Sequence, residues 1–246
     1  MELYEKQAQF ELQMWKKTML KEPSFADLLS KKIQTKINNV IPDKVHQAIT
    51  TTIQKMVQVV LLGSAYSSSK PIENASLQYR EAFIKRQIEI YKKTASAEGA
   101  LTGAGGILLG LADFPLLLGI KLKLLFEIAA LYGYDARDYR ERLYILYVFQ
   151  LSFSSRKRQK EVFACLSGWE GFLQTLPDTV ENFDWRTFQQ EYRDYIDLAK
   201  MAQLIPVIGA AVGAIANYRL IDKLGTTAIN CYRMRHKPLT EAAEIT

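Results

Sequence analysis

Residues 97–135 read AEGALTGAGGILLGLADFPLLLGIKLKLLFEIAALYGYD, and this stretch decides the fold class. It begins with a glycine cluster, passes a single aspartate and continues as a largely apolar run. Four of the glycines follow the spacing i, i+4, i+7 and i+11, which is one face of a helix: Gly99, Gly103, Gly106 and Gly110. Each glycine costs up to about 1 kcal/mol in a helix interior. Their shared face therefore favours a close approach by another helix backbone.

A second stretch of small residues is the expected partner of this face. Residues 204–221 read LIPVIGAAVGAIANYRLI, where Gly209, Gly213 and Ala216 repeat the i, i+4 and i+7 spacing. Asn217 continues the same face, and an amide at such a place more often ties two helices together than binds a ligand. We therefore predict that two Gly/Ala-rich helices pack closely against each other.

Helical periodicity also dominates the rest of the chain, and strand signals are nearly absent. We predict helices near residues 3–21, 24–40, 42–63, 72–111, 136–153, 156–175, 184–201 and 206–235. One more helix begins after Asp113 and ends near Gly133. The predicted fold is an all-α, single-domain multi-helix bundle. Within it we expect a basic, amphipathic N-terminal helical portion over residues 1–70 and a helical core over residues 71–246.

The glycine cluster does not have the pattern of a nucleotide-binding loop. A Walker loop needs a Gly-Lys pair after a strand, and the chain has no Gly-Lys pair. A dinucleotide fingerprint read from Gly103 needs a glycine at position 108, where Leu108 stands. The residues before the cluster have the period of a helix. We therefore exclude nucleotide binding by this stretch.

Two stretches approach the length of a membrane-spanning helix. Residues 99–120 carry only Asp113 as a charge, and residues 201–218 carry none. A spanning helix needs roughly 20 apolar residues. However, Asp113 near the bilayer centre would cost on the order of 3 kcal/mol, and Pro115 breaks the helix there. A buried or interfacial hairpin fits better, with integral insertion of a re-entrant hairpin as the alternative.

The polar residues point to packing rather than to catalysis. Asp113 is expected to cap its own helix, and the alternative is that it pairs with a ligand or with a buried cation, for which Arg142 and Arg219 are the candidates. His46 and His236, the only histidines, lie near no pattern typical of a catalytic triad. We assign no catalytic residue, no metal site and no cofactor, and the sequence favours a non-enzymatic protein.

Charge and cysteine content narrow the class of partner. The 246 residues carry 32 basic and 26 acidic side chains, for a net charge of +6. This excess favours an anionic surface but is weak evidence for nucleic acid, which we do not expect as a partner. Cys165 and Cys231 are far apart, which fits a reducing compartment. The first residues, MELYEKQAQF, lack the apolar core of a secretory signal, so we expect a cytoplasmic protein.

Basic side chains cluster beside the apolar helices, which is typical of attraction to anionic lipid at about 1 kcal/mol per residue. A solvated charged face is the alternative explanation. The residues predicted to form this membrane or partner surface are Lys31, Lys32, Lys36, Arg156, Lys157, Arg158, Arg233 and Arg235.

Three segments together resemble one known family. These are the glycine-rich stretch up to YGYD, the following RERLYILYVF, and LIPVIGAAVGAIANYRLIDKLGTTAINCYRMR. They closely resemble the EcsC protein family, over nearly the whole chain. The resemblance implies a bacterial helical protein, cytoplasmic or membrane-associated, near an ABC transporter made of an ATPase and a membrane subunit. It implies no particular reaction.

We therefore expect a peripheral protein on the cytoplasmic face of the membrane that engages anionic lipid, ABC transporter subunits, or both. Two other classes stay open. One is a soluble ligand-binding protein or enzyme with a pocket near Asp113. The other is an integral membrane protein in which the glycine-rich hairpin enters the bilayer.

Overall fold

The computed structural model describes residues 3–21, 70–103, 114–154, 156–176 and 209–236, together with a few positions between 47 and 60. The helices in these ranges are α1 (Leu3–Leu20), α4 (Leu77–Gly103), α6 (Phe114–Tyr132), α7 (Tyr139–Phe153), α8 (Arg156–Ser167), α9 (Trp169–Leu173) and α11 (Gly209–Arg235). No strand occurs in the described part of the chain, and the predicted all-α bundle is confirmed. Several predicted site residues lie outside the described residues: Lys31, Lys32, Lys36, Gly106, Gly110 and Asp113.

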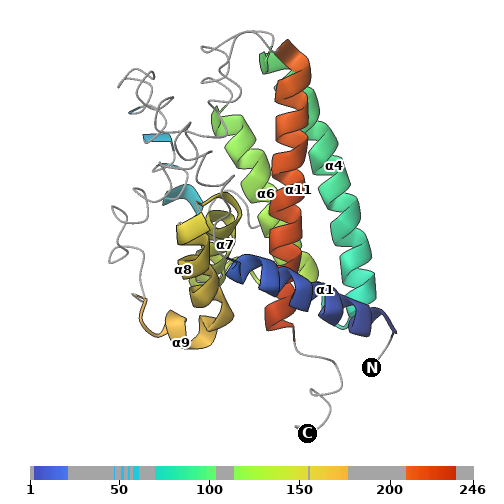
Figure 1. Cartoon of the computed structure of the whole chain (residues 1–246), viewed down its shortest axis with the longest axis vertical. Helices are drawn as coiled ribbons and strands as arrows, with labels where there is room; N and C mark the ends of the chain where they lie inside the picture. Colours follow the sequence, from blue (N-terminus) through green and yellow to red (C-terminus); the bar gives the residue numbers. More distant parts are fainter. Residues whose placement is uncertain are drawn as a thin grey trace, which may run out of the picture.

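The two longest of these helices, α4 and α11, run side by side along the molecule (Figure 1). They are antiparallel, because the residue numbers of the contacting positions decrease along α4 as those of α11 increase. The Asn217 amide donates to the Ala95 carbonyl at 3.0 Å, and the Arg233 guanidinium meets Glu81 further along the pair at 2.6 Å. Asn217 therefore ties the two helices together, as its sequence position suggested.

The antiparallel register relates the two small-residue stretches. Continuing it from the Asn217–Ala95 contact along both helices sets Gly99 opposite Gly213 and Gly103 opposite Gly209. The structure describes only the backbone at Gly103, Gly209 and Gly213. The close packing of these glycines stays a prediction. The observed register of α4 and α11 is the one that this packing requires.

Helix α7 forms the centre of the hydrophobic core. Every residue from Leu143 to Phe153 is buried, on all faces of the helix, because α6, α8 and α11 surround it. Helix α1 lies across the lower ends of α4 and α11, as Figure 1 shows. None of the described helices is both long and apolar enough to cross a membrane.

Two glycines set helix boundaries in the described ranges. Gly133 follows α6 with φ of +94°, a left-handed conformation that ends the helix where the sequence predicted. Gly168 separates α8 from α9, so the single helix predicted over residues 156–175 is wrong. The physical reason is that glycine is a weak helix former, and Gly168 takes the N-cap position of α9 with φ of −114°.

Gly225 of α11 packs against Ile88 of α4 without room for a side chain. A Cβ atom at this position would lie 2.5 Å from Cδ1 and 2.7 Å from Cγ1 of Ile88. Gly225→Ala should therefore lower the free energy of unfolding by about 1–3 kcal/mol through overpacking, although alanine is the better helix former. Urea denaturation measures the change. The matched test is a double-mutant cycle: because Ile88→Ala removes the crowded side chain but has its own cavity cost, Gly225→Ala should cost less in the Ile88→Ala background than in the unchanged protein. An equal or greater cost of Gly225→Ala in that background would contradict the overpacking explanation.

Candidate functional site

Helix α1 is apolar on two opposite faces. The inner face follows helical spacing and packs onto the bundle through Tyr4, Ala8, Leu12, Trp15 and Met19. Ala8 and Leu12 are only 3% and 9% exposed. The Trp15 ring meets Phe163 of α8 edge-on, with ring centroids 5.6 Å apart.

The outer face of α1 carries large apolar side chains into solvent. Leu3, Phe10 and Met14 are 84%, 68% and 49% exposed, and their spacing of seven and then four residues places them in one stripe. Three exposed lysines, Lys6, Lys17 and Lys21, lie in or beside the stripe. We call these six residues the outer α1 surface. An apolar stripe bordered by lysines is typical of a helix that lies in a membrane interface.

A buried arginine fixes the inner face of α1 to the core. Arg233 of α11 binds both carboxylate oxygens of Glu81 on α4, at 2.7 Å through Nε and 2.6 Å through Nη2. Its Nη1 reaches Oε2 of Glu11 on α1 at 2.9 Å. The Tyr4 hydroxyl of α1 also donates to Glu81, at 2.7 Å. One ion cluster therefore joins three helices, and it pairs the carboxylate of Glu11 on α1 with Arg233.

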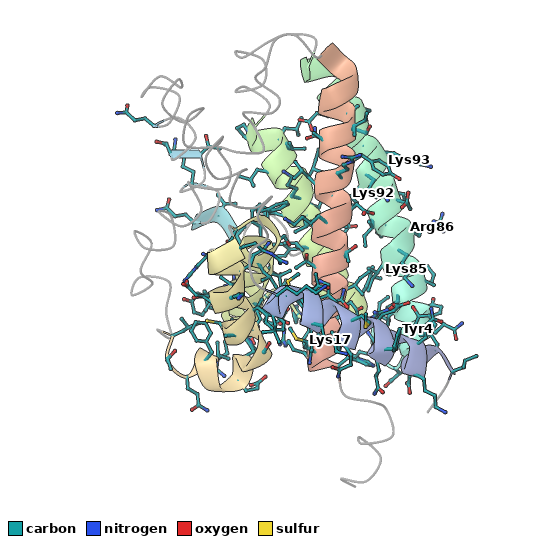
Figure 2. All side chains as sticks on the ribbon, in the orientation of Figure 1. Tyr4, Lys17, Lys85, Arg86, Lys92 and Lys93 are labelled. Atoms are coloured by element: carbon teal, nitrogen blue, oxygen red, sulfur yellow. The ribbon has the colours of Figure 1, made fainter. Side chains whose placement is uncertain are left out.

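The ends of α1 are held by further polar contacts. Figure 2 shows Tyr4 where α1 meets α4, close to Lys85, whose ammonium donates to the Tyr4 hydroxyl at 3.1 Å. At the other end, the Arg156 guanidinium of α8 donates to the Thr18 carbonyl at 3.1 Å. Because both ends are fixed, the outer α1 surface has a defined orientation relative to the bundle.

Three members of the cluster have shifted pKa values, which follow from burial and from their hydrogen bonds. Burial disfavours the charge on Arg233, but the hydrogen bonds and attraction from Glu81 outweigh burial and raise the pKa of Arg233. Burial also acts to raise the pKa of Glu11, yet the hydrogen bond from Arg233 leaves that pKa below its usual value. The pKa of Tyr4 is raised, first by burial and then by its hydrogen bond to Glu81. These shifts favour a charged Arg233, a charged Glu11 and a neutral Tyr4 hydroxyl.

A second buried cluster closes the end of α11. The Arg235 guanidinium binds Glu141 of α7 at 2.8 Å, and the Tyr232 hydroxyl donates to the same carboxylate at 2.6 Å. The guanidinium also lies 4.1 Å from the ring centroids of Tyr134 and Tyr144. Such cation–π contacts favour an arginine in a partly buried site. This cluster fixes α11 against α7 and against the segment that follows α6.

Two arginines of α11 do not belong to the membrane or partner surface that the sequence predicted. Arg233 and Arg235 were expected to face a membrane or partner, but in the structure they point inward. The reason is that Glu81 and Glu141, far away in the sequence, are buried and need cationic partners. Neither arginine therefore contributes to an outer basic surface.

The other predicted site residues are scattered. Arg142 donates to the carbonyls of Ala136 and Arg137, and Arg219 is exposed. Arg158 pairs with Glu161 at 2.8 Å, and the side chain of Lys157 is outside the description. Asp113, for which Arg142 and Arg219 were the candidate partners, lies outside the described residues.

Sequence reasoning missed the outer α1 surface. Its signal is the spacing of Leu3, Phe10 and Met14 at i, i+7 and i+11, which is one face of a helix. Within the described ranges, no group of three or more His, Cys, Asp or Glu side chains could hold a metal ion.

Comparison with known proteins connects this architecture to a family. The model of the EcsC protein family matches residues 6–236. The chain is similar to "Protein EcsC" of Bacillus subtilis (strain 168), at 46% identity over 222 residues, which cover 90% of this chain and 91% of that protein. It is also similar to "Uncharacterized protein YdbA" of the same strain, at 28% identity over 183 residues, covering 74% of this chain and 67% of that protein. No solved structure matches the chain.

Proposed function

Because the chain belongs to the EcsC protein family, whose match includes most of α1 and the helices that hold it, we propose that this whole helical body attaches to an anionic membrane surface. Attachment occurs through the outer α1 surface and involves no catalysis. The observation that carries the proposal is the exposed stripe of Leu3, Phe10 and Met14 with its lysines, on a helix whose opposite face is anchored in the bundle.

The side chains of this surface match the two components of a membrane interface, which are charged head groups and apolar acyl chains. Lysines near an anionic bilayer contribute about 1 kcal/mol each, which gives roughly 3 kcal/mol for Lys6, Lys17 and Lys21. Moving the apolar side chains of Leu3, Phe10 and Met14 out of water adds a favourable term, about 1.5–3 kcal/mol for each one that becomes fully buried. A helix with such a surface binds the interface reversibly, as peripheral proteins do.

The ion cluster around Arg233 holds the outer α1 surface exposed before any membrane is bound. Glu11 would reduce the positive charge of α1, but its carboxylate is engaged by Arg233. The inner face of α1 packs against the core, and the apolar stripe on its outer face stays exposed to solvent. In the cell we propose the cytoplasmic face of the membrane as the site of attachment. We also propose ABC transporter subunits as the neighbouring protein partner, which is what the family resemblance implies.

Vesicle binding tests the proposal directly. The full-length protein should co-sediment with vesicles that contain phosphatidylglycerol, and should bind pure phosphatidylcholine vesicles at least about tenfold more weakly. Raising the salt concentration should weaken the binding, because it screens exposed charges. Equal binding to the two vesicle types would overturn the proposal.

A charge-matched pair of variants locates the surface. Lys6→Glu/Lys17→Glu should reduce binding to the anionic vesicles at least about tenfold, because each substitution replaces attraction by repulsion. The control, Arg140→Glu/Arg219→Glu, changes the net charge equally at exposed positions on α7 and α11 and should leave binding within about twofold. If the control lost binding as strongly, net charge rather than α1 would be responsible.

A further inference from the structure

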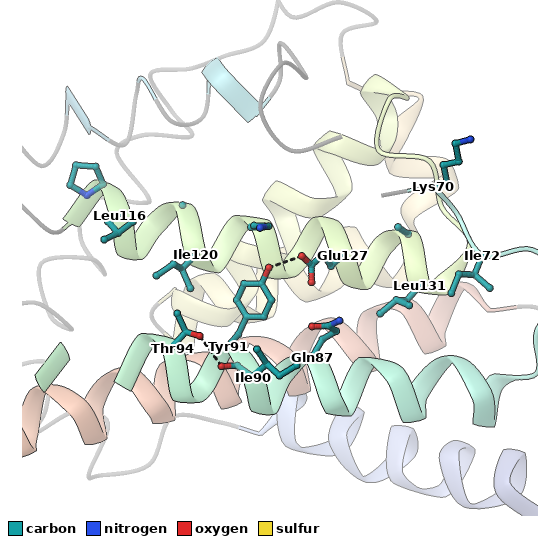
Figure 3. A pocket seen from close by; sticks show the side chains of 14 residues that line it. Lys70, Ile72, Gln87, Ile90, Tyr91, Thr94, Leu116, Ile120, Glu127 and Leu131 are labelled. Carbon is teal, nitrogen blue, oxygen red and sulfur yellow. Dashed lines mark hydrogen bonds between the residues drawn. The ribbon is translucent and has the colours of Figure 1, made fainter. Parts of the chain in front are cut away.

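A groove of about 830 Å³ runs between α4 and α6 (Figure 3). This volume lies within the range of about 300–1,000 Å³ that is typical of small-ligand sites. The groove extends along α6 from Pro115 to Leu131, which is about 24 Å at the rise of an α-helix. Its shape is long and open on one side. We call it the α4–α6 groove.

One end of the α4–α6 groove is apolar. Leu116 and Ile120 of α6 lie there, with Thr94 of α4 beside them in Figure 3. Leu116 is 57% exposed, and Ile90 of α4, further along the groove, is 46% exposed. Both are therefore accessible to a ligand, and covering them would remove apolar surface from water.

Further along, the groove becomes polar. The Tyr91 hydroxyl of α4 donates to Glu127 Oε1 of α6 at 2.7 Å, which Figure 3 shows in the middle of the groove. Burial and the hydrogen bond to Glu127 raise the pKa of Tyr91, so its hydroxyl stays a proton donor. This bond leaves Glu127 Oε2 without a contact to Tyr91. Gln87 lies beside the pair and adds an amide donor and acceptor.

Two lysines give the polar part an excess of positive charge. Lys70 and Lys123 line the groove and are exposed, and neither forms an ion pair or hydrogen bond within the part of the chain that the structure describes. The only carboxylate that lines the groove there is that of Glu127. The polar part therefore suits a negatively charged head group that also has a hydroxyl, because the lysines attract the charge and the Glu127 carboxylate can accept a hydrogen bond from the hydroxyl.

We propose that the α4–α6 groove binds a single-chain amphiphile whose phosphate head group carries a free hydroxyl, as in lysophosphatidylglycerol. The acyl chain covers Leu116, Ile120 and Ile90 at the apolar end. Lys123 attracts the phosphate, Lys70 adds positive charge at the far end of the groove, and the head-group hydroxyl donates to Glu127. Different side chains of the site therefore bind the acyl chain and the head group of the ligand.

This site is separate from the outer α1 surface. On α4, the residues that contact α1 are Glu81 and Lys85, whereas Gln87, Tyr91 and Thr94 line the groove. At about 100° per residue the centres of these two sets lie about 130° apart around the helix. Ligand binding in the groove therefore does not require attachment of α1 to a membrane.

Isothermal titration of the full-length protein with lysophosphatidylglycerol, below the concentration at which it forms micelles, tests the proposal. We expect saturable binding of one molecule per chain. Leu116→Glu should weaken it at least about tenfold, because it places a charge against the acyl chain. The matched control, Ile215→Glu, changes a side chain of similar exposure on α11 and should have little effect. The absence of saturable binding, or equal effects of the two variants, would overturn the proposal.

Head-group variants and other ligands test the polar part. Lys123→Glu should weaken binding of lysophosphatidylglycerol at least about tenfold. Lysophosphatidylcholine, which is neutral overall and whose choline head group has no hydroxyl, and a fatty acid, which lacks the phosphate, should each bind more weakly. Equal affinity for either would overturn the assigned head group. Lys6→Glu/Lys17→Glu should retain the ligand, so failure of the groove proposal and failure of membrane attachment are distinguishable.

Discussion

Replacing Arg233 by alanine should lower the free energy of unfolding by about 3–5 kcal/mol. The substitution leaves the Glu81 carboxylate, which is 0% exposed, without its cation in the interior. Removing one partner of a buried ion pair has a cost of this size because the remaining charge is neither solvated nor paired. Two tyrosine hydroxyls, from Tyr4 and Tyr132, still donate to Glu81, so the carboxylate keeps hydrogen bonds but loses its counter-charge.

Urea denaturation followed by far-ultraviolet circular dichroism measures the loss. Arg137→Ala is the matched control, because Arg137 also pairs with a carboxylate, Asp135, but at an exposed position. Its effect should be below about 1 kcal/mol. The double variant Glu81→Gln/Arg233→Met should lose less than Arg233→Ala, because it leaves no buried charge. A value for Arg233→Ala within about 1 kcal/mol of the unchanged protein would mean that the buried pair does not stabilise the fold.

Replacing Lys121 by methionine should instead stabilise the protein, by about 3 kcal/mol at pH 7. The Lys121 side chain is 9% exposed and its ammonium lies 5.0 Å from the centroid of the Phe153 ring. Burial lowers the pKa of Lys121 from 10.5 to about 8, although the charge of Glu98 acts in the opposite direction. Each pKa unit corresponds to about 1.4 kcal/mol, so the folded state at pH 7 carries a buried charge at this cost. Methionine has a similar shape and no charge.

The pH dependence of this gain follows from the sign of the shift. A lysine pKa that is lower in the folded state means that the full stability is present above about pH 10.5 and is lost as the pH falls through about 8. The advantage of Lys121→Met should therefore be largest below pH 8 and nearly absent above pH 10.5. Denaturation of both proteins at several pH values measures the difference. Lys123→Met, at an exposed neighbouring position, should change stability by less than about 0.5 kcal/mol at every pH.

Helix identity and several helix ends could be predicted from the sequence because they depend on local chemistry. The helix predicted over residues 3–21 is found at Leu3–Leu20, and the helix predicted to end near Gly133 ends at Tyr132. Proline, glycine and apolar spacing act within a few residues, so they can be recognised without knowledge of the fold. The boundary at Gly168 was missed because a single glycine inside a helical pattern is often tolerated.

The candidate site depended on contacts that no local pattern contains. Lys17 and Arg233 both appear in the sequence as basic residues beside an apolar helix, yet Lys17 faces solvent and Arg233 binds Glu81 in the core. Which of the two outcomes applies depends on a carboxylate 152 positions away in the chain. The α4–α6 groove has the same origin, because its two walls come from helices that meet only in the folded molecule.

The sequence by itself determined the helical class and the positive net charge, because composition and periodicity are properties of the chain. Its similarity to known sequences showed the family. Tertiary structure alone decided which charges are neutralised in the interior and which apolar faces are left exposed. The physical reason is that a charge is stable in the core only beside a partner, and an apolar face is buried only where another element covers it. Both conditions depend on how distant helices meet, as Arg233 and the outer α1 surface show.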